Sequence, residues 1–111
     1  MNELKIQDLV EGSGKEISKG ALLTAHYTGW LEDGTEFDSS HNRGSFQCVI
    51  GTGRVIKGWD QGLIGMKVGG KRKLSVPSHL AYGERQMGPV IKPNSNLIFE
   101  IELLDVLTRD E

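Results

Sequence analysis

The sequence predicts an α+β fold, an antiparallel β-sheet that carries one short helix on one face. Apolar and polar residues alternate with a period of two along much of the chain, which is typical of strands with one buried face. Helical spacing occurs in one segment only. Glycine is abundant, with 15 in 111 residues, where average usage of ~7% would give about 8. The chain therefore has many turns between short elements.

The clearest strand pattern covers residues 97–103, where apolar side chains hold every odd position and glutamates hold positions 100 and 102. Residues 23–31 alternate in the same way, and in residues 73–77 Leu74 and Val76 alternate with polar neighbours. Weaker patterns predict strands at 4–9 and 46–50. Asp33-Gly34, between residues 30–31 and 36–37, is a hairpin-turn signal.

Ile56, Trp59 and Leu63 are three and four residues apart, which predicts a short helix. Gly58 and Gly62 each weaken it by ~1 kcal/mol, so the helix depends on packing its apolar face against the sheet. Residues 78–95 lose all periodicity and are rich in Gly, Pro, Asn and Ser. A loop of this length is more often functional or mobile than incidental.

Length and composition favour a single domain spanning residues 1–111. The net charge of −2 favours no nucleic-acid partner. No apolar run approaches the ~18 residues of a membrane span, and the amino terminus has no apolar signal-peptide core. The single cysteine, Cys48, cannot form an internal disulfide, which favours a reducing cytoplasm.

Local patterns favour no metal ion and no cofactor. His26, His41 and His79 share no ligand spacing with one another or with Cys48. Cys48 lies in a predicted strand, where a small buried apolar role is expected.

No glycine segment matches a phosphate-binding fingerprint, and no serine has the setting of a nucleophile. The basic residues Lys67, Lys71, Arg72 and Lys73 are expected to form a solvated turn and strand face.

Two segments leave alternatives open. In residues 37–40 an acid, Asp38, directly follows Phe37, and two serines come next. Asp38 there fits a plain turn or cap as well as a functional group. In residues 81–83, Tyr82 lies at the start of the long loop, where its role could be only to hold the loop in place. Local pattern alone indicates a small β-rich domain with a long loop.

Taken together, seven segments occur in an order and spacing that resemble the FKBP-type peptidyl-prolyl cis–trans isomerases, the immunophilins that bind tacrolimus and rapamycin. These segments are His26-Tyr27-Thr28-Gly29, Asp33-Gly34, Phe37-Asp38-Ser39-Ser40, Val55-Ile56-Lys57-Gly58-Trp59, Gly65-Met66, Ala81-Tyr82-Gly83 and Leu97-Ile98-Phe99-Glu100. The resemblance runs from about residue 4 to residue 107. Gly69-Gly70-Lys71-Arg72 and the acidic end look more like bacterial single-domain members.

The resemblance implies a curved antiparallel sheet wrapped around the helix, with a hydrophobic pocket between them. It implies a binding pocket made of Tyr27, Phe37, Asp38, Arg43, Phe46, Val55, Ile56, Trp59, Tyr82, Val90, Ile91 and Phe99. Catalytic roles would fall to five of the residues, namely Asp38, Tyr82, Ile56, Trp59 and Phe99. Cys48 departs from the family pattern by standing where an aromatic residue is common, and Lys92-Pro93 replaces a pair of prolines.

The implied function is isomerisation (rotamase activity) of X-Pro amide bonds in peptides and in unfolded or folding proteins, by non-covalent stabilisation of the twisted amide. Tacrolimus and rapamycin would inhibit it. The resemblance further implies a cytoplasmic monomer that assists protein folding, with no membrane or nucleic-acid partner. The alternative is a chaperone or binding module that docks proline-containing or hydrophobic segments, with incidental turnover.

Overall fold

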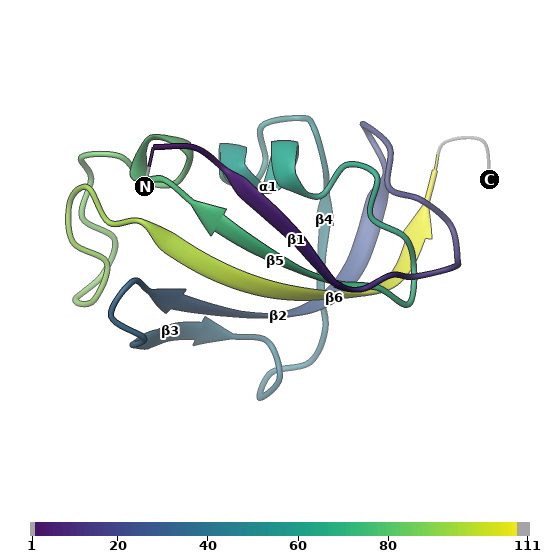
Figure 1. Cartoon of the computed structure of the whole chain (residues 1–111), viewed down its shortest axis with the longest axis horizontal. Helices are drawn as coiled ribbons and strands as arrows, with labels where there is room; N and C mark the ends of the chain where they lie inside the picture. Colours follow the sequence, from purple (N-terminus) through teal and green to yellow (C-terminus); the bar gives the residue numbers. More distant parts are fainter. Residues whose placement is uncertain (1, 109–111) are drawn as a thin grey trace.

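The computed structural model describes residues 2–108. Figure 1 shows the elements of this part of the chain. In chain order they are the strands β1 (Lys5–Val10), β2 (Leu22–Leu31), β3 (Glu36–Ser39) and β4 (Phe46–Val49), the helix α1 (Lys57–Gly62), the strand β5 (Lys71–Val76), the 3₁₀ turn η1 (Ser78–Leu80) and the strand β6 (Leu97–Leu107).

The strands form one antiparallel sheet in the order β1-β5-β6-β2-β3, and β4 also pairs with β2. The sheet curves beneath α1, which covers its concave face (Figure 1). The predicted α+β class with one short helix is confirmed. A single cluster of buried apolar side chains fills the space between helix and sheet, with Leu23, Leu63, Leu74 and Ile101 completely buried.

The central pair β2 and β6 runs longer than the alternation predicted. β6 continues past Leu103 to Leu107. A bulge interrupts its pairing with β2 at this point, since Thr24 and Ala25 are neighbours but pair with Asp105 and Leu103. The unpaired residue, Leu104, is exposed, and Val106 then returns to the buried face. The bulge shifts the side-chain phase by one residue, which ended the period-two signal at residue 103.

The hairpin at Asp33-Gly34 is confirmed. β2 and β3 are antiparallel partners, and Gly34 has a φ of 92°, a conformation that favours glycine. The Asp33 carboxylate accepts a hydrogen bond of 2.9 Å from the Thr35 N–H. This turn returns the chain so that β3 places Phe37 and Asp38 beside the end of β2.

The helix α1 begins and ends one residue inside the predicted segment, with Ile56 and Leu63 as its caps. Its two glycines let it approach β5 very closely. A Cβ on Gly58 would lie 2.5 Å from Val76 Cγ1, and one on Gly62 would lie 2.8 Å from Leu74 Cδ2. The glycines that weaken the helix intrinsically therefore allow the packing on which it depends.

The two weak strands are displaced slightly from their predicted bounds. β1 covers Lys5–Val10 rather than residues 4–9, and β4 ends at Val49 rather than at residue 50. Every residue of β1 is exposed, because β1 is an edge strand lying beside β5. Its sequence therefore carries little alternation from which bounds can be read.

The expectation that the basic cluster is wholly solvated is wrong for Arg72, which is 8% exposed. Its guanidinium donates to the carbonyl oxygens of Gly62 and Ile64 at 3.0 and 3.1 Å and to the Asp8 carboxylate at 2.7 Å. Arg72 thus satisfies carbonyls at the end of α1 and ties them to β1. These partners make burial of the charge acceptable.

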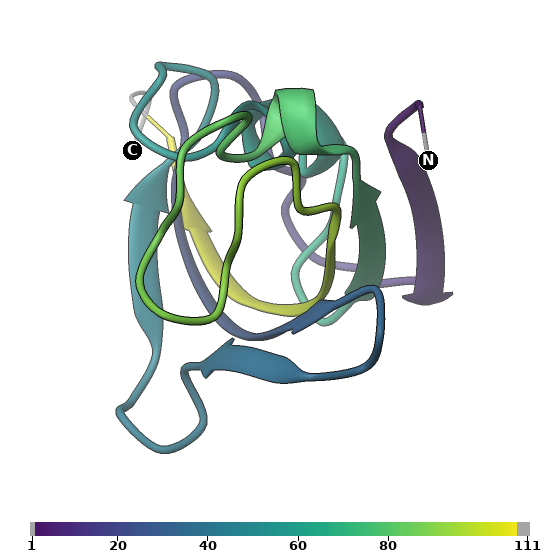
Figure 2. The same ribbon diagram turned by 90° about the vertical axis from the view of Figure 1, so that its left-hand side faces the viewer.

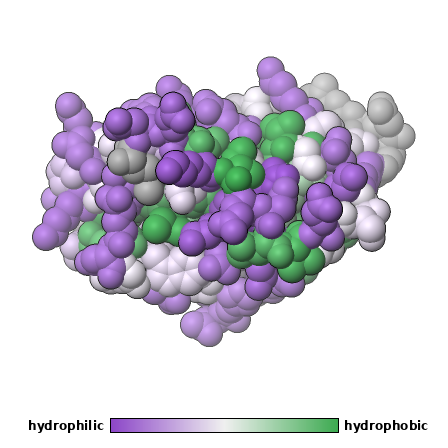
Figure 3. Space-filling model, viewed as in Figure 1, coloured by the Kyte–Doolittle hydropathy of each residue, from purple (hydrophilic) through white to green (hydrophobic). Residues whose placement is uncertain are grey.

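The face that carries β1 is largely hydrophilic, and its apolar side chains gather in separate spots rather than one continuous patch (Figure 3). Ile6, Leu9 and Val10 on β1 are among the exposed apolar residues. In residues 2–108, none of the helices has the length and apolar character needed to cross a membrane.

Candidate functional site

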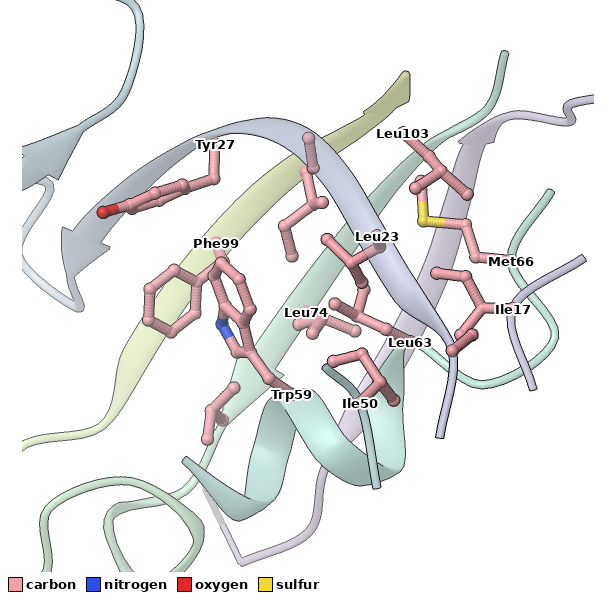
Figure 4. Close-up of a cluster of buried hydrophobic side chains, with 14 of the residues drawn as sticks. Ile17, Leu23, Tyr27, Ile50, Trp59, Leu63, Met66, Leu74, Phe99 and Leu103 are labelled. Atoms are coloured by element: carbon pink, nitrogen blue, oxygen red, sulfur yellow. The ribbon is translucent and has the colours of Figure 1, made fainter. Parts of the chain in front are cut away.

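Trp59 lies at the centre of an aromatic cluster. It projects from α1 toward the sheet, where Figure 4 shows it beside Phe99 of β6, with Tyr27 of β2 on the nearby strand. Its ring centroid is 5.2 Å from that of Tyr27, 5.4 Å from that of Phe99 and 5.8 Å from that of Phe46, each pair nearly perpendicular. Edge-to-face pairs contribute about 0.5–1.5 kcal/mol each beyond burial. The cluster therefore holds the indole of Trp59, 5% exposed, in one orientation.

Phe37 packs against the Phe99 ring of this cluster. Its ring meets the Phe99 ring edge-on at 5.7 Å and 85°. The approach requires glycine at position 29 in β2, where a Cβ would lie 2.6 Å from Phe37 Cζ and 3.0 Å from Phe99 Cε1. Gly29, Phe37 and Phe99 together fix the position of the Phe99 ring.

An open cavity of about 740 Å³ lies over the aromatic cluster. Eight of the residues implied by the resemblance line it, namely Tyr27, Asp38, Phe46, Val55, Ile56, Trp59, Tyr82 and Phe99. They come from β2, β3, β4, β6, α1 with the loop before it, and the segment after η1. The fold thus brings together side chains as far as 72 positions apart, from Tyr27 to Phe99.

Four residues implied by the resemblance do not line the cavity. Phe37 packs behind Phe99, as described above. Arg43 is exposed and reaches the site through Asp38 and Tyr27. In the long loop, Ile91 is buried, and Val90 is 38% exposed. The loop closes on itself there, with a hydrogen bond of 2.9 Å from the Met87 N–H to the Ile91 carbonyl.

The polar side of the cavity is a network around the Asp38 carboxylate. The Tyr27 hydroxyl donates to Asp38 Oδ2 at 2.5 Å, and Arg43 Nη2 donates to Asp38 Oδ1 at 2.7 Å. Arg43 Nη2 also donates to the Tyr27 hydroxyl at 3.1 Å, and the Ser39 N–H donates to Asp38 Oδ1 at 2.9 Å. Asp38 therefore accepts a hydrogen bond from the next backbone N–H in β3 and also lies in the cavity wall.

Burial, together with the hydrogen bond to Asp38, raises the pKa of Tyr27 to about 12. The hydrogen bond to Tyr27 and the charge of Asp38 raise the pKa of Arg43 above its ordinary value. Burial also raises the pKa of Tyr82, with a smaller contribution from Asp38. Both tyrosines therefore keep their hydroxyl hydrogens at neutral pH, and both serve as hydrogen-bond donors.

Several donors of the cavity-lining residues have no acceptor within residues 2–108, and two of them are uncharged groups outside the indole of Trp59. One is the backbone N–H of Ile56, the cap of α1, and the other is the Tyr82 hydroxyl. Each lies in the cavity wall without a hydrogen bond to the described part of the chain. Both are therefore free to donate to a carbonyl oxygen of a bound molecule.

Several lining residues escaped the sequence analysis. They are Gly53, Arg54, Lys57, His79, Ala81, Gly83 and Arg85. All seven lie within three positions of Val55, Ile56 or Tyr82, so proximity along the chain was the available signal. Asp60 was also missed. Its carboxylate accepts hydrogen bonds from the N–H groups of Gly51 and Gly53 at 2.7 and 2.9 Å, which fixes the loop before α1.

Cys48 does not line the cavity. It is partly buried, and desolvation raises the pKa of its thiol to about 12. It pairs with Leu23 in the register between β4 and β2. Because burial disfavours the thiolate form, the surroundings of Cys48 do not activate it as a nucleophile.

Two of the three histidines lie side by side. The rings of His26 and His41 stack at 4.8 Å, and His26 Nδ1 lies 2.9 Å from the hydroxyl oxygen of buried Ser40. His79 lies in the cavity wall. Within residues 2–108, no three His, Cys, Asp or Glu side chains are grouped in a way that could hold a metal ion.

Comparisons with known proteins agree with this geometry. Residues 13–104 match the family model described as FKBP-type peptidyl-prolyl cis–trans isomerase. An FK506-binding protein of Neisseria meningitidis is 58% identical over 107 residues, which cover 96% of this chain and 98% of that protein. Mouse peptidyl-prolyl cis–trans isomerase FKBP2 is 57% identical over 94 residues, 84% of this chain and 67% of that protein.

Solved structures show the same fold. The crystal structure of AtFKBP13 matches with a TM-score of 0.87 and 46% identity, over 94% of this chain and 93% of that chain. The crystal structure of FkpA from Escherichia coli matches with a TM-score of 0.84 and 42% identity, over 93% of this chain and 47% of that chain. The chain therefore belongs to the FKBP-type peptidyl-prolyl cis–trans isomerase family.

Proposed function

We propose that the cavity over Trp59 catalyses rotation about X-Pro amide bonds by binding the twisted amide more tightly than the planar one. The proposal is carried by one observation, a cavity over an aromatic cluster whose wall includes the unpaired Ile56 N–H and Tyr82 hydroxyl. Rotation about an amide breaks its resonance and requires no proton transfer. Differential binding of the two geometries is therefore sufficient.

The aromatic residues hold the proline ring in this proposal. The rings of Trp59, Phe46 and Phe99 and the side chains of Val55 and Tyr27 form an apolar enclosure of suitable chemistry. Removing water from the amide weakens the solvation of its planar, charge-separated form. A rate gain of ~10⁴–10⁶ requires only about 5–8 kcal/mol.

The polar groups orient the substrate. The Ile56 N–H and the Tyr82 hydroxyl donate to substrate carbonyls on either side of the rotating bond. Asp38 faces the rotating amide, and Tyr27 and Arg43 hold its carboxylate in place. No side chain acts as a general acid or base in this scheme.

We extend the proposal to ligands and setting. Tacrolimus and rapamycin occupy the same cavity and inhibit turnover in this proposal. The names of FK506-binding relatives support the binding of tacrolimus (FK506). We propose a single domain for residues 1–111, and the one core cluster within residues 2–108 supports this. We propose that this domain acts as a cytoplasmic monomer on unfolded or folding proteins, a setting that the single free cysteine favours.

Exchange spectroscopy by NMR on an X-Pro peptide, with and without rapamycin, tests the proposal. We expect the protein to accelerate cis–trans exchange and saturating rapamycin to abolish the acceleration. Exchange at the uncatalysed rate would leave a binding module and contradict the catalytic role. Catalysis that persists at saturating rapamycin would place the activity outside the cavity.

A further inference from the structure

Three cationic side chains surround the mouth of the cavity. Arg54 precedes Val55 in the loop before α1, Lys57 is the first residue of α1, and Arg85 follows η1. All three line the cavity and are exposed to solvent. Figure 2 looks onto this end of the molecule, where the long loop that carries Arg85 crosses in the foreground.

Hydrogen bonds order the backbone next to two of these cations, Arg54 and Arg85. The Asp60 carboxylate binds the N–H groups of Gly51 and Gly53, directly before Arg54. On the opposite segment, the Gly83 N–H donates to the Ser78 carbonyl at 2.8 Å, and the Arg85 N–H donates to the Tyr82 carbonyl at 3.1 Å. The backbone positions from which Arg54 and Arg85 extend at the cavity mouth are therefore ordered.

No described acidic side chain neutralises these cations. Within residues 2–108, none of Arg54, Lys57 and Arg85 makes an ion pair or a side-chain hydrogen bond. The one acid in the cavity wall, Asp38, is paired with Arg43 at 2.7 Å. The cavity mouth therefore carries an excess of positive charge, although the whole chain has a net charge of −2.

The positive charge of Arg85 acts on Tyr82, whose hydroxyl is proposed to bind substrate. Burial and Asp38 raise the pKa of the Tyr82 hydroxyl, and the positive charge of Arg85 opposes them. The guanidinium of Arg85 is thus close enough to act on a group in the cavity wall. A carboxylate on a bound peptide would experience the same field with the favourable sign.

We propose that the preferred substrates carry an Asp or Glu side chain within two residues of the proline, recognised by Arg54, Lys57 and Arg85. The inference rests on the proposed function, since the proline must occupy the cavity. An extended peptide advances ~3.3–3.6 Å per residue, so two residues carry a side chain about 7 Å from the proline to the cavity mouth. Arg guanidinium groups bind carboxylates through paired, charge-assisted hydrogen bonds.

The expected preference is modest because the cations are exposed. Exposed ion pairs are individually weak, and three together correspond to about a 3–10-fold gain in kcat/KM at low salt. The Debye length, over which salt screens a charge, falls from ~10 Å at 0.1 M salt to ~3 Å at 1 M. The preference should therefore shrink at high salt, whereas binding of the proline ring itself should not.

The test compares peptides that differ only by Glu or Gln at one of four positions, from two residues before the proline to two residues after it. NMR exchange measures kcat/KM for each pair with the wild type, with the double variant Arg54→Gln/Arg85→Gln and with the control Lys5→Gln. Lys5 is exposed on β1 and does not line the cavity. Gln is nearly isosteric with Glu, so the ratio within each pair isolates the charge.

We expect the Glu-to-Gln ratio to exceed 3 at one or more positions in the wild type, to fall toward 1 in the double variant and to persist in Lys5→Gln. A wild-type ratio of 3 or less at all four positions would overturn the inference, as would a ratio that the double variant leaves unchanged. Those results, with Gln peptides still catalysed, would leave the proposed function intact. Exchange of neither peptide would instead overturn both.

Discussion

The Tyr27 hydroxyl donates a hydrogen bond of 2.5 Å to the Asp38 carboxylate, and this contact joins β2 to β3 at the edge of the cavity. Arg43 closes the network by donating to both residues. The Asp38 carboxylate, a charged group among aromatic side chains, is therefore held in place by two side-chain donors. In the proposed mechanism, this fixes the direction in which its charge acts on a bound amide.

The first prediction concerns the polar groups of the cavity. Asp38→Val should lower kcat/KM for an X-Pro peptide about tenfold, the equivalent of ~1.4 kcal/mol, because the field on the rotating amide is lost. Tyr82→Phe should lower it further by removing a carbonyl donor. NMR exchange rates measure both effects. Full activity of the Asp38→Val/Tyr82→Phe double variant would refute both polar roles.

The second prediction concerns alkaline pH. The pKa of Tyr27 is about 12 in the folded protein and ~10 in an unfolded chain. Between these values, the folded state binds the proton that the unfolded state has lost. The free energy of unfolding should therefore fall as pH rises from 10 to 12. Urea unfolding at pH 9 and pH 11 measures the loss.

Tyr27→Phe is the control for that titration. This variant cannot ionise at position 27, so its loss between pH 9 and pH 11 should be smaller than in the wild type. The comparison uses the change with pH, since the variant also lacks the hydrogen bond to Asp38. An identical loss in both proteins would mean that Tyr27 does not titrate abnormally.

The third prediction separates helix propensity from packing. Gly58→Ala should stabilise an isolated helix by ~1 kcal/mol, yet here it should destabilise the protein by about 1–3 kcal/mol. The new Cβ would lie 2.5 Å from Val76 Cγ1, and Val76 is fully buried. Thermal unfolding measures the effect. Gln61→Ala, at an exposed position of α1, should change stability by no more than ~0.5 kcal/mol.

The fourth prediction concerns the buried cation. Arg72→Met should destabilise the protein by about 1–3 kcal/mol, because the carbonyls of Gly62 and Ile64 lose their donor. Lys71→Met, at the neighbouring position on the other face of β5, is the matched control and should have little effect. Equal stability of the two variants in urea unfolding would argue against the role assigned to Arg72.

The fifth prediction concerns the thiol. Burial raises the pKa of Cys48 to about 12, so at pH 8 its thiolate fraction should be on the order of 10³-fold lower than that of an exposed cysteine. Alkylation of the native protein by iodoacetamide should be slower than that of the urea-unfolded protein by a comparable factor. Equal rates would contradict the buried environment.

The strands were predictable where one face is buried and the other is solvated. Residues 97–103 follow that rule and form the middle of β6. The exposed edge strand β1 carries no such signal, so the predicted strand at residues 4–9 begins and ends one residue before β1 itself. The bulge at Leu104 reverses the phase, and its position depends on pairing with β2. No local pattern contains that information.

The site was predictable in its apolar part, because the resemblance supplied the order of segments around Trp59. The role of Arg72 was not predictable, since buried cations are rare. Its acceptors lie at the end of α1, just after α1 and in β1, 8 to 64 residues away. The cationic mouth was also missed. Arg54 and Arg85 are 31 positions apart, and their common cavity exists only in the folded chain.

The most direct test of the central proposal locates the proline during catalysis. Intermolecular nuclear Overhauser effects should be measured between an X-Pro peptide in fast exchange and the ring protons of the protein. We expect proline ring protons to show contacts with Trp59, Phe99 and Tyr27, and to lose them when rapamycin is added. Catalysed exchange with contacts to other residues, and none to Trp59, would contradict the account.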